Sequence, residues 1–387
     1  MMFDVDQTFP EIREAVRKLC AGFPGQYWRD LDRDRAYPTG FVQALTEAGF
    51  LSVLIPEAYG GSGLGLGAAT AVLEEIHRSG CNGAACHAQM YTMGTILRHG
   101  SPAQKQAYLP KIASGELRLQ AFGVTEPTAG TDTTRITTFA RREGDYYYVS
   151  GQKIWISRAE HSDLMVLLCR TTSRERVSKS SDGMSVLIVD MREAVGAGLT
   201  IRPIRTMLNH ATTELFFDNL AVPVANLIGQ EGKGFRYILD GMNAERILIA
   251  SECIGDGRFF IDRASAYAQE RQVFGRAIGQ NQGVQFPIAR AYVQLSAAAL
   301  MVGHAAELFD AGEACGTEAN MAKLLASEAS WTAADMCVQT HGGFGFAEEF
   351  DIERKFRETR LYQVAPISTN LILSHVATHV LKLPKSF

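Results

Sequence analysis

The spacing of apolar residues changes twice along this 387-residue chain, and this limits the folds that it can adopt. Up to about residue 119, apolar side chains recur every three or four positions in segments such as EIREAVRKLC and AATAVLEEIHRSG, which predicts helices. From about Ala121 the pattern becomes short alternating or β-branched runs, such as DYYYVSGQKIWIS and DLMVLLCR, which predict strands. Helical spacing then returns in four long stretches, near 235–271, 283–311, 318–340 and 367–383. The sequence therefore predicts an α-helical domain over 1–119, a central β domain over 120–229 and an antiparallel four-helix bundle over 230–387.

Composition and charge exclude several classes of protein. With 46% hydrophobic and 21% charged residues the chain has an ordinary globular composition, which argues against a disordered, collagen-like or coiled-coil protein. Lys plus Arg number 38 against 42 for Asp plus Glu, without long runs of one sign, so a nucleic-acid-binding protein is not expected.

The cysteines and the start of the chain indicate a compartment. Seven scattered cysteines do not form the dense pairs of a secreted scaffold, which favours a reducing environment. The segment MMFDVDQTFPEIREAV has early acidic residues and no apolar core of a signal peptide, and no window of about eighteen uninterrupted apolar residues occurs. We expect a soluble, cytoplasmic protein with no membrane partner.

Several short motifs give weaker signals. The glycines of PEAYGGSGLGLGAAT run G-x-G-x-G, which does not match the dinucleotide fingerprint, and GQEGKGF lacks the spacing of a phosphate loop. Cys81, Cys86 and His87 lie close together but have no fourth ligand at zinc spacing, so a packed helical segment is favoured and no metal is predicted.

More specific are the segments AFGVTEPTAGTD (121–132) and GQKIWIS (151–157). Together they resemble the flavin-binding signature of the acyl-CoA dehydrogenase family. PEAYGG, VPVANLIGQEGKGF, ERQVFG, QNQG, QTHGGFGF and ERKFRETRLYQ follow in the family's order and spacing, so the resemblance covers nearly the whole chain.

The resemblance implies a mainly α fold, in which an α-helical domain, a β-barrel-like domain and a four-helix bundle bind FAD, usually in a homotetramer. It implies an FAD-dependent oxidoreductase of fatty acid metabolism. A carboxylate takes the α-proton of an acyl-CoA, the β-hydrogen leaves as hydride to the flavin, and the product is the trans-2-enoyl-CoA. An electron-transferring flavoprotein is the usual acceptor.

The resemblance also assigns cofactor-binding residues. Trp155 is expected to pack on the flavin, and the Ser157 hydroxyl to lie near N5, where a donor stabilises developing charge. Without the family, Trp155 would equally be a half-buried strand aromatic. The remaining positions that match the segments around the flavin ring and diphosphate are Phe122, Val124, Thr125, Thr131, Ser368 and Asn370.

A second group matches positions that reach the diphosphate and adenosine of a cofactor bound in the neighbouring subunit. The guanidinium of Arg271 suits a diphosphate because it carries permanent charge and a fork of donors, although a solvated helix-end charge is the alternative. The whole group comprises Arg271, Phe274, Gln282, Gln339, Gly342 and Gly343.

The family's usual catalytic glutamate is missing. It lies in a Y-Q-I-Y-E-G-T-S-Q run, whereas this chain reads YQVAPISTN and has Pro366 at the glutamate position. Proline supplies no carboxylate, and it lacks the N–H that helps to polarise the thioester carbonyl in relatives.

Some relatives carry the base on the first bundle helix instead, in a segment ending Glu-Arg, and this chain has Glu245-Arg246 there. On a helical wheel Glu245 shares a sector about 80° wide with apolar residues, including Met242 and Ile249. Burial on that stripe would raise the carboxyl pKa toward neutrality, as a general base requires. The competing interpretation is that Glu245 forms an ion pair with Arg246 or another arginine. Asn243, Arg246 and Thr131 match positions near the acyl-CoA.

The sequence thus favours an acyl-CoA dehydrogenase with Glu245 as base, acting on a short, medium or branched acyl-CoA. Two alternatives remain open, a flavin oxidase or monooxygenase of the same fold and a non-catalytic acyl-CoA-binding scaffold. Chain length, pathway and oligomer symmetry cannot be predicted from the residues.

Overall fold

The computed structural model describes residues 8–385 and separates them into two compact units. One unit comprises residues up to Asp34, Gly65–Gly83 and Asn243 onward, and the other comprises Arg35–Leu64 and Ala84–Met242. The first seven residues, which include part of the segment on which the absence of a signal peptide was predicted, lie outside the described part. The division into three domains remains a prediction.

The helices of the amino-terminal region include those that the periodicity predicts. Their bounds are α1 (Pro10–Ala21), α2 (Gly25–Asp34), α3 (Thr39–Glu47), α4 (Leu66–Arg78), α5 (Ala84–His99) and α6 (Pro102–Ser114). Helix α6 begins with a capping box, in which the Ser101 hydroxyl accepts from the Gln104 N–H and the Gln104 side chain accepts from the Ser101 N–H. The glycine-rich segment before α4 contains short 3-10 turns and no strand, as expected for a linker between helices.

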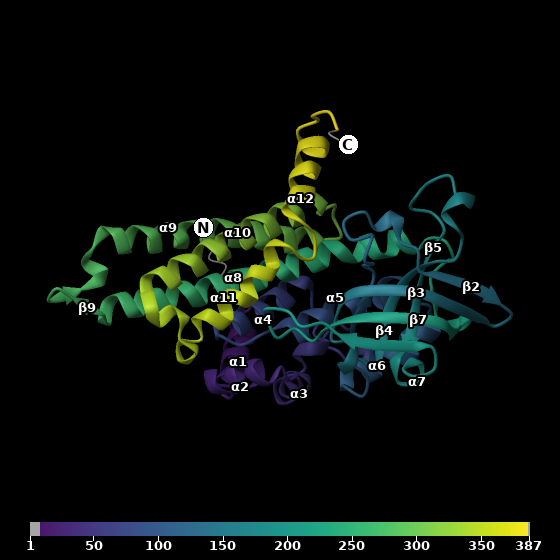
Figure 1. Ribbon diagram of the computed structural model, residues 1–387, viewed down its shortest axis with the longest axis horizontal. Coiled ribbons are helices and arrows are strands. Elements are labelled where there is room, and N and C mark those ends of the chain that lie inside the picture. Colours follow the sequence, from purple (N-terminus) through teal and green to yellow (C-terminus); the bar gives the residue numbers. More distant parts are fainter. Residues whose placement is uncertain (1–7, 386–387) are drawn as a thin grey trace. The chain divides into compact units, whose positions relative to one another are not determined.

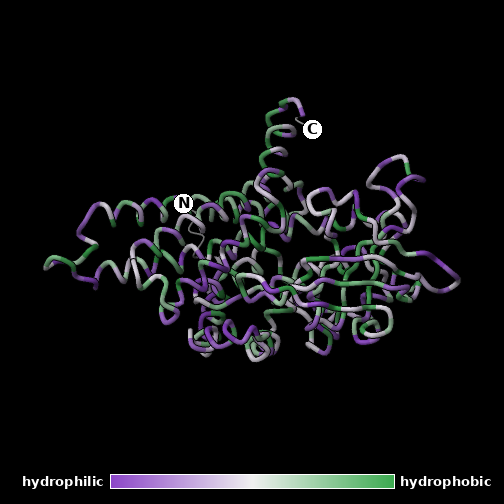
Figure 2. The backbone as a smooth tube through the Cα atoms, viewed as in Figure 1, coloured by the Kyte–Doolittle hydropathy of each residue, from purple (hydrophilic) through white to green (hydrophobic). Residues whose placement is uncertain are grey.

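The central region forms one mixed eight-stranded sheet (Figure 1). Its strands are β1 (Leu119–Gly123), β2 (Phe139–Glu143), β3 (Tyr146–Ser157), β4 (Leu164–Arg170), β5 (Met184–Asp190), β6 (Leu199–Pro203), β7 (Thr212–Pro223) and β8 (Leu227–Ile228). The order is β6-β7-β3-β2-β4-β5-β8, and β1 pairs in parallel with β4. In Figure 2 the end of β2 and the turn into β3 are hydrophilic, consistent with the Arg-Arg-Glu-Gly-Asp sequence over 141–145.

At β4 both faces of the sheet are buried, because alternate residues of this strand enter different cores. Met165, Leu167 and Cys169 join a core formed by residues of the sheet and its adjoining turns. Leu164, Val166 and Leu168 join a second core, which contains Met93 and Ile96 of α5 and Leu109 and Ile112 of α6. This arrangement holds β1 and the loop after it against helices on one side.

The carboxy-terminal region contains three long helices, α8 (Gly234–Glu270), α9 (Gln282–Asp310) and α10 (Gly316–His341). Helices α9 and α10 pack side by side (Figure 1). A small hairpin of β9 (Gln272–Val273) and β10 (Arg276–Ala277) lies between α8 and α9.

The fourth long helix, expected over 367–383, is shorter than predicted and ends in a π-helical turn. The structure has α11 (Ile352–Arg360) before it, then the short α12 (Thr369–His375), and then a π-helical turn over Val376–Val380. The Ser368 hydroxyl accepts from the Leu371 N–H and caps α12. Pro366 lies two residues before this cap, and residues 381–385 after the π-helical turn are not helical, so the helical stretch covers 369–380 and not the expected 367–383.

Candidate functional site

Strand β1 and the loop after it carry the first group of predicted flavin residues. The Phe122 ring packs edge-on against Tyr91 of α5, with ring centroids 5.3 Å apart. The Thr125 carbonyl accepts from the Ile154 N–H at 2.9 Å, which joins this loop to β3. Thr131 is exposed farther along the same loop. The structure therefore brings the two halves of the signature, 121–132 and 151–157, together.

Trp155 has an unusual backbone and an unusual exposure. Its φ is +62°, in the left-handed region that an aromatic residue rarely adopts, and the pairing of β3 with β7 shifts register between Ile154 and Ile156. The side chain is 57% exposed, whereas the neighbouring Ile156 is buried. The exposed indole of Trp155 fits the face of an isoalloxazine ring, and the partly exposed Ser157 beside it fits the edge of that ring.

The second group of predicted cofactor residues lies at the ends of the long helices. Arg271 directly follows α8, and its guanidinium carbon lies 5.9 Å from the centroid of the Phe344 ring, in the turn after α10. Tyr267 of α8 stacks on His341 of α10 at 4.2 Å, which holds these two helix ends together.

The glycines in that turn leave open space. A Cβ built on Gly342 or Gly343 would meet no other atom within 4 Å, and Gly342 has a φ of +60°. Phe274, at the tip of the β9–β10 hairpin, is fully exposed, and Gln282 begins α9. A cationic fork, a free aromatic side chain and an open glycine turn fit the diphosphate and adenosine of a dinucleotide.

Glu245 lies on the buried side of α8, as the wheel predicts. Its side chain is 7% exposed, and Ile249 and Cys253 on the same stripe are also buried. Burial raises the pKa of Glu245 to about 7, and the charge of Arg246 only partly opposes the rise. That pKa suits a proton acceptor that works near neutral pH.

The competing interpretation, an ion pair between Glu245 and Arg246 or another arginine, does not hold among the described residues. Arg246 Nη1 instead donates to Asn243 Oδ1 at 3.0 Å. Among residues 8–385, no hydrogen bond or ion pair reaches the Glu245 carboxylate. A buried carboxyl group without a cationic partner is costly for the fold and is typical of a functional site.

The carboxy-terminal segment supplies Ser368 and Asn370 at the start of α12. Lys323 Nζ of α10 donates to the Ile367 carbonyl at 2.9 Å and fixes the segment just before them. Pro366 lies in this same stretch. The position that carries the usual glutamate in the family is therefore part of an ordered turn without a carboxylate.

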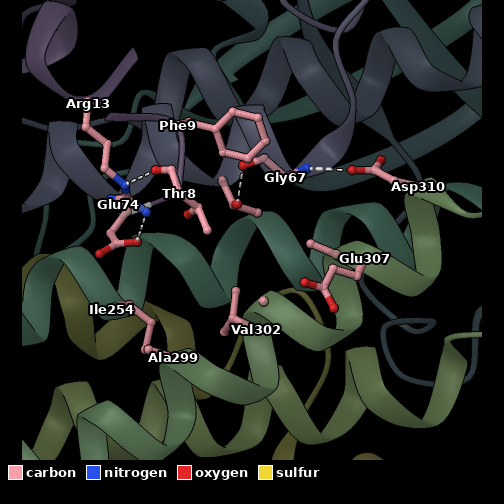
Figure 3. A pocket seen from close by; sticks show the side chains of 13 residues that line it. Thr8, Phe9, Arg13, Gly67, Glu74, Ile254, Ala299, Val302, Glu307 and Asp310 are labelled. Atoms are coloured by element: carbon pink, nitrogen blue, oxygen red, sulfur yellow. Dashed lines mark hydrogen bonds and ion pairs between the residues drawn. The ribbon is translucent and has the colours of Figure 1, made fainter. Parts of the chain in front are cut away.

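A separate cavity of about 300 Å³ lies among α1, α4, α8 and α9 (Figure 3). Figure 3 shows Ile254, Ala299 and Val302 on one side of it, and the Gly67 N–H donating to Asp310 on another. None of the predicted cofactor or substrate residues lines this cavity.

Comparisons with known proteins decide the family. Models of the acyl-CoA dehydrogenase N-terminal, middle and C-terminal domains match residues 7–116, 121–220 and 232–381. The chain belongs to the acyl-CoA dehydrogenase family. It is 33% identical to acyl-CoA dehydrogenase FadE12 of Mycobacterium tuberculosis over 379 residues, which cover 97% of this chain and 96% of that protein.

Solved structures with a similar fold agree with this family assignment. A glutaryl-coenzyme A dehydrogenase in complex with glutaryl-CoA superposes with a TM-score of 0.91 at 30% identity, covering 100% of this chain and 98% of that chain. A chain from the structure of the electron transferring flavoprotein of Acidaminococcus fermentans has a TM-score of 0.92 at 29% identity, covering 99% of this chain and 100% of that one.

This acyl-CoA dehydrogenase family member is thus an FAD-dependent oxidoreductase that acts on CH–CH groups, and the expected fold and cofactor are confirmed. The alternative of a non-catalytic acyl-CoA-binding scaffold is not supported. The individual site residues remain predictions, as does an orientation of Glu245 toward the flavin.

Sequence reasoning missed two residues inside the signature itself, Glu126 and Lys153. Both are almost completely buried, and they form an ion pair of 2.9 Å. The available signal was Lys153, a charged residue at an inward position of a β-strand, which usually has a specific partner.

Proposed function

We propose that this protein dehydrogenates an acyl-CoA between Cα and Cβ, with Glu245 as the general base. The observation that carries the proposal is the Glu245 carboxyl group, which is buried, lacks a cationic partner among the described residues and has a pKa near 7. A short, medium or branched acyl group remains the expected substrate.

The chain's own residues account for the proton and for the placement of the reactants. Glu245 takes the α-proton of the thioester, and the electron pair of the broken Cα–H bond forms the new double bond. The neutral acid that results at Glu245 is well suited to its apolar surroundings. When bound, FAD accepts the β-hydrogen as a hydride, and the product is the trans-2-enoyl-CoA. Trp155 would hold the ring, and the Ser157 hydroxyl would donate to the atom where charge accumulates.

Pro366 affects how the thioester carbonyl of the substrate is polarised. Because proline has no N–H, position 366 cannot polarise the thioester carbonyl as the glutamate of relatives does. The donor that replaces it must come from another residue or from the cofactor.

An anaerobic titration with a panel of acyl-CoA thioesters tests the proposal. We expect at least one member to bleach the visible absorbance of the bound flavin without any added reductant, and a trans-2-enoyl-CoA to form. If no acyl-CoA bleaches the flavin but a nicotinamide reductant does, the proposal is wrong and the flavin-dependent monooxygenase is favoured. If oxygen reoxidises the reduced enzyme faster than an electron-transferring flavoprotein does, an oxidase is favoured.

We further propose an electron-transferring flavoprotein as acceptor and a role in fatty acid metabolism. The acceptor is supported by the similarity to a chain in the structure of such a flavoprotein. A cytoplasmic location is supported by the seven cysteines, which form no disulfide among residues 8–385.

A homotetramer would explain the exposed face of α9. This helix is long and apolar enough to cross a membrane by length and composition, yet only 28% of its most apolar window is buried. Phe286, Tyr292, Val293 and Leu300 are all exposed on it, and apolar residues recur along its length in Figure 2. An apolar face of this length is best covered by copies of the same chain.

The variant Val293→Asp tests this assembly. A charge placed on a buried subunit interface costs several kcal/mol, so we expect the variant to be smaller than the wild type in sedimentation at micromolar concentration. Gln294→Asp, an exposed polar position beside it, is the control. A wild-type protein that sediments as a monomer would contradict the proposal.

A further inference from the structure

Lys153 is the most deeply buried ammonium group of the sheet. It lies in β3 with no exposed surface, and Nζ donates to the Val124 carbonyl at 2.8 Å and to Glu126 Oε1 at 2.9 Å. Burial lowers the pKa of Lys153, and the charge of Glu126 opposes that shift. The ammonium thus joins a strand to two positions of the loop after β1, Val124 and Glu126.

Glu126 extends the contact to a third segment. Its Oε2 accepts from the N–H and the hydroxyl of Thr137 at 2.6 and 2.9 Å, and its Oε1 accepts from the Thr138 N–H at 2.9 Å. Although burial alone would raise it, the charge of Lys153 and these hydrogen bonds hold the pKa of Glu126 below its ordinary value. Every bond in this group favours the ionised carboxylate.

The loop is also fixed around Glu126 itself. Glu126 and Ala129 exchange backbone hydrogen bonds of 3.2 and 3.1 Å, which close a tight turn. Val124 and Thr125 precede this turn and Thr131 follows it. These three are residues expected to contact the flavin, so the turn sets the spacing between them.

The ion pair also fixes the start of the irregularity in β3. In a regular strand the side chains of Lys153, Trp155 and Ser157 would share one face. Here Lys153 and Ile156 are buried while Trp155 is exposed, because the register shifts between Ile154 and Ile156.

A positive φ at a tryptophan is unfavourable and persists only where the surrounding contacts impose it. Lys153 provides such a contact before Trp155. After it, the Thr213 hydroxyl donates to the Ile156 carbonyl at 2.8 Å.

We propose that Glu126 and Lys153 are positioning residues for the flavin. Their buried ion pair locks the loop after β1 and the irregular part of β3 into one unit, so that Thr125, Trp155 and Ser157 are presented in a fixed arrangement. Buried ion pairs contribute little net stability compared with apolar residues, and fixing one arrangement is their best attested role. The inference rests on the placement of these segments around FAD, which is part of the proposed function.

The double variant Glu126→Gln/Lys153→Met tests the role, because it removes both charges and leaves neither one buried alone. Glu126→Gln and Lys153→Met as single variants each leave an uncompensated group, so we expect them to lose more stability than the double variant. We expect the double variant to fold, to release FAD at least tenfold faster than the wild type, and to lose the fine structure of the bound-flavin spectrum. The released FAD is followed by its fluorescence after dilution of the holoenzyme.

A matched pair elsewhere separates positioning from stability. Arg13 Nη2 of α1 and Glu74 Oε2 of α4 form a comparably buried ion pair of 3.0 Å within a network that also includes Glu75 and Arg258, and neither lies in a segment expected to contact the flavin. We expect Glu74→Gln/Arg13→Met to lower the melting temperature while leaving the FAD release rate and the flavin spectrum unchanged.

Two outcomes would overturn the inference. One is a Glu126/Lys153 double variant with the release rate and spectrum of the wild type, and the other is an equal acceleration of FAD release in both double variants. Neither the FAD release rate nor the flavin spectrum requires an acyl-CoA for its measurement, so a failure of the proposed dehydrogenation would be seen separately.

Discussion

We expect Glu245→Gln to lose nearly all reduction of bound flavin by acyl-CoA while the flavin stays in place. Glutamine has nearly the shape of glutamate but cannot accept the α-proton, and a positioned general base contributes on the order of 10² to 10⁴ in rate. Because the α-proton of a thioester is a weak acid, we expect a loss at the upper end, about 10³-fold or more. Rapid-mixing measurements of flavin absorbance without oxygen check this value.

The control for this variant lies on the same helix. Glu270→Gln makes the same substitution at the exposed last residue of α8 and should reduce flavin at the wild-type rate. Retained reduction in Glu245→Gln, with FAD bound and the protein folded, would remove Glu245 from the mechanism. If adding Pro366→Glu to the Glu245→Gln variant restored activity, positions 245 and 366 would both reach the α-proton of the substrate.

The features that could be predicted from the sequence are those set by periodicity. Strand β3 and helices α8 to α10 follow from the spacing of apolar residues, because each has one face directed at a core. The burial of Glu245 follows from the same argument, since its neighbours on the wheel, Ile249 and Cys253, are apolar and buried.

Helix α5 shows where periodicity fails. Twelve of its sixteen residues are buried, so it has no polar face and no stripe to detect. Its sequence, AACHAQMYTMGTILRH, contains polar residues that would ordinarily be exposed, and His87, Gln89, Thr92 and Thr95 are nevertheless buried. Its role in covering the sheet depends on tertiary contacts that a local pattern does not contain.

The geometry of the site was also beyond local patterns. The left-handed backbone at Trp155 depends on the register between β3 and β7, and the partner of Lys153 is 27 residues away. The family signature does contain both residues, but it does not show that they contact one another. Pairing across that distance is a property of the folded sheet.

Glu245→Gln also stabilises the protein at alkaline pH, and the sign follows from the carboxyl pKa. The ordinary pKa is 4.5 and the folded value is about 7, so the folded state binds the proton more tightly than the unfolded chain does. Below pH 4.5 the group is protonated in both states and costs nothing; the cost grows as pH rises through the interval and is complete above about 7. At about 1.4 kcal/mol for each pKa unit, the full cost is on the order of 3 kcal/mol.

Urea denaturation of wild type and variant measures this difference. We expect Glu245→Gln to exceed the wild type in free energy of unfolding by up to about 3 kcal/mol at pH 8 and to match it near pH 4.5, whereas Glu270→Gln shows no such trend. A variant less stable than the wild type at pH 8 would mean that the ionised carboxylate has a favourable partner in the folded protein. A carboxyl group that destabilises the fold at working pH is retained for its chemistry. The two Glu245→Gln measurements, the loss of flavin reduction and the gain in stability, therefore both test whether Glu245 is the buried general base.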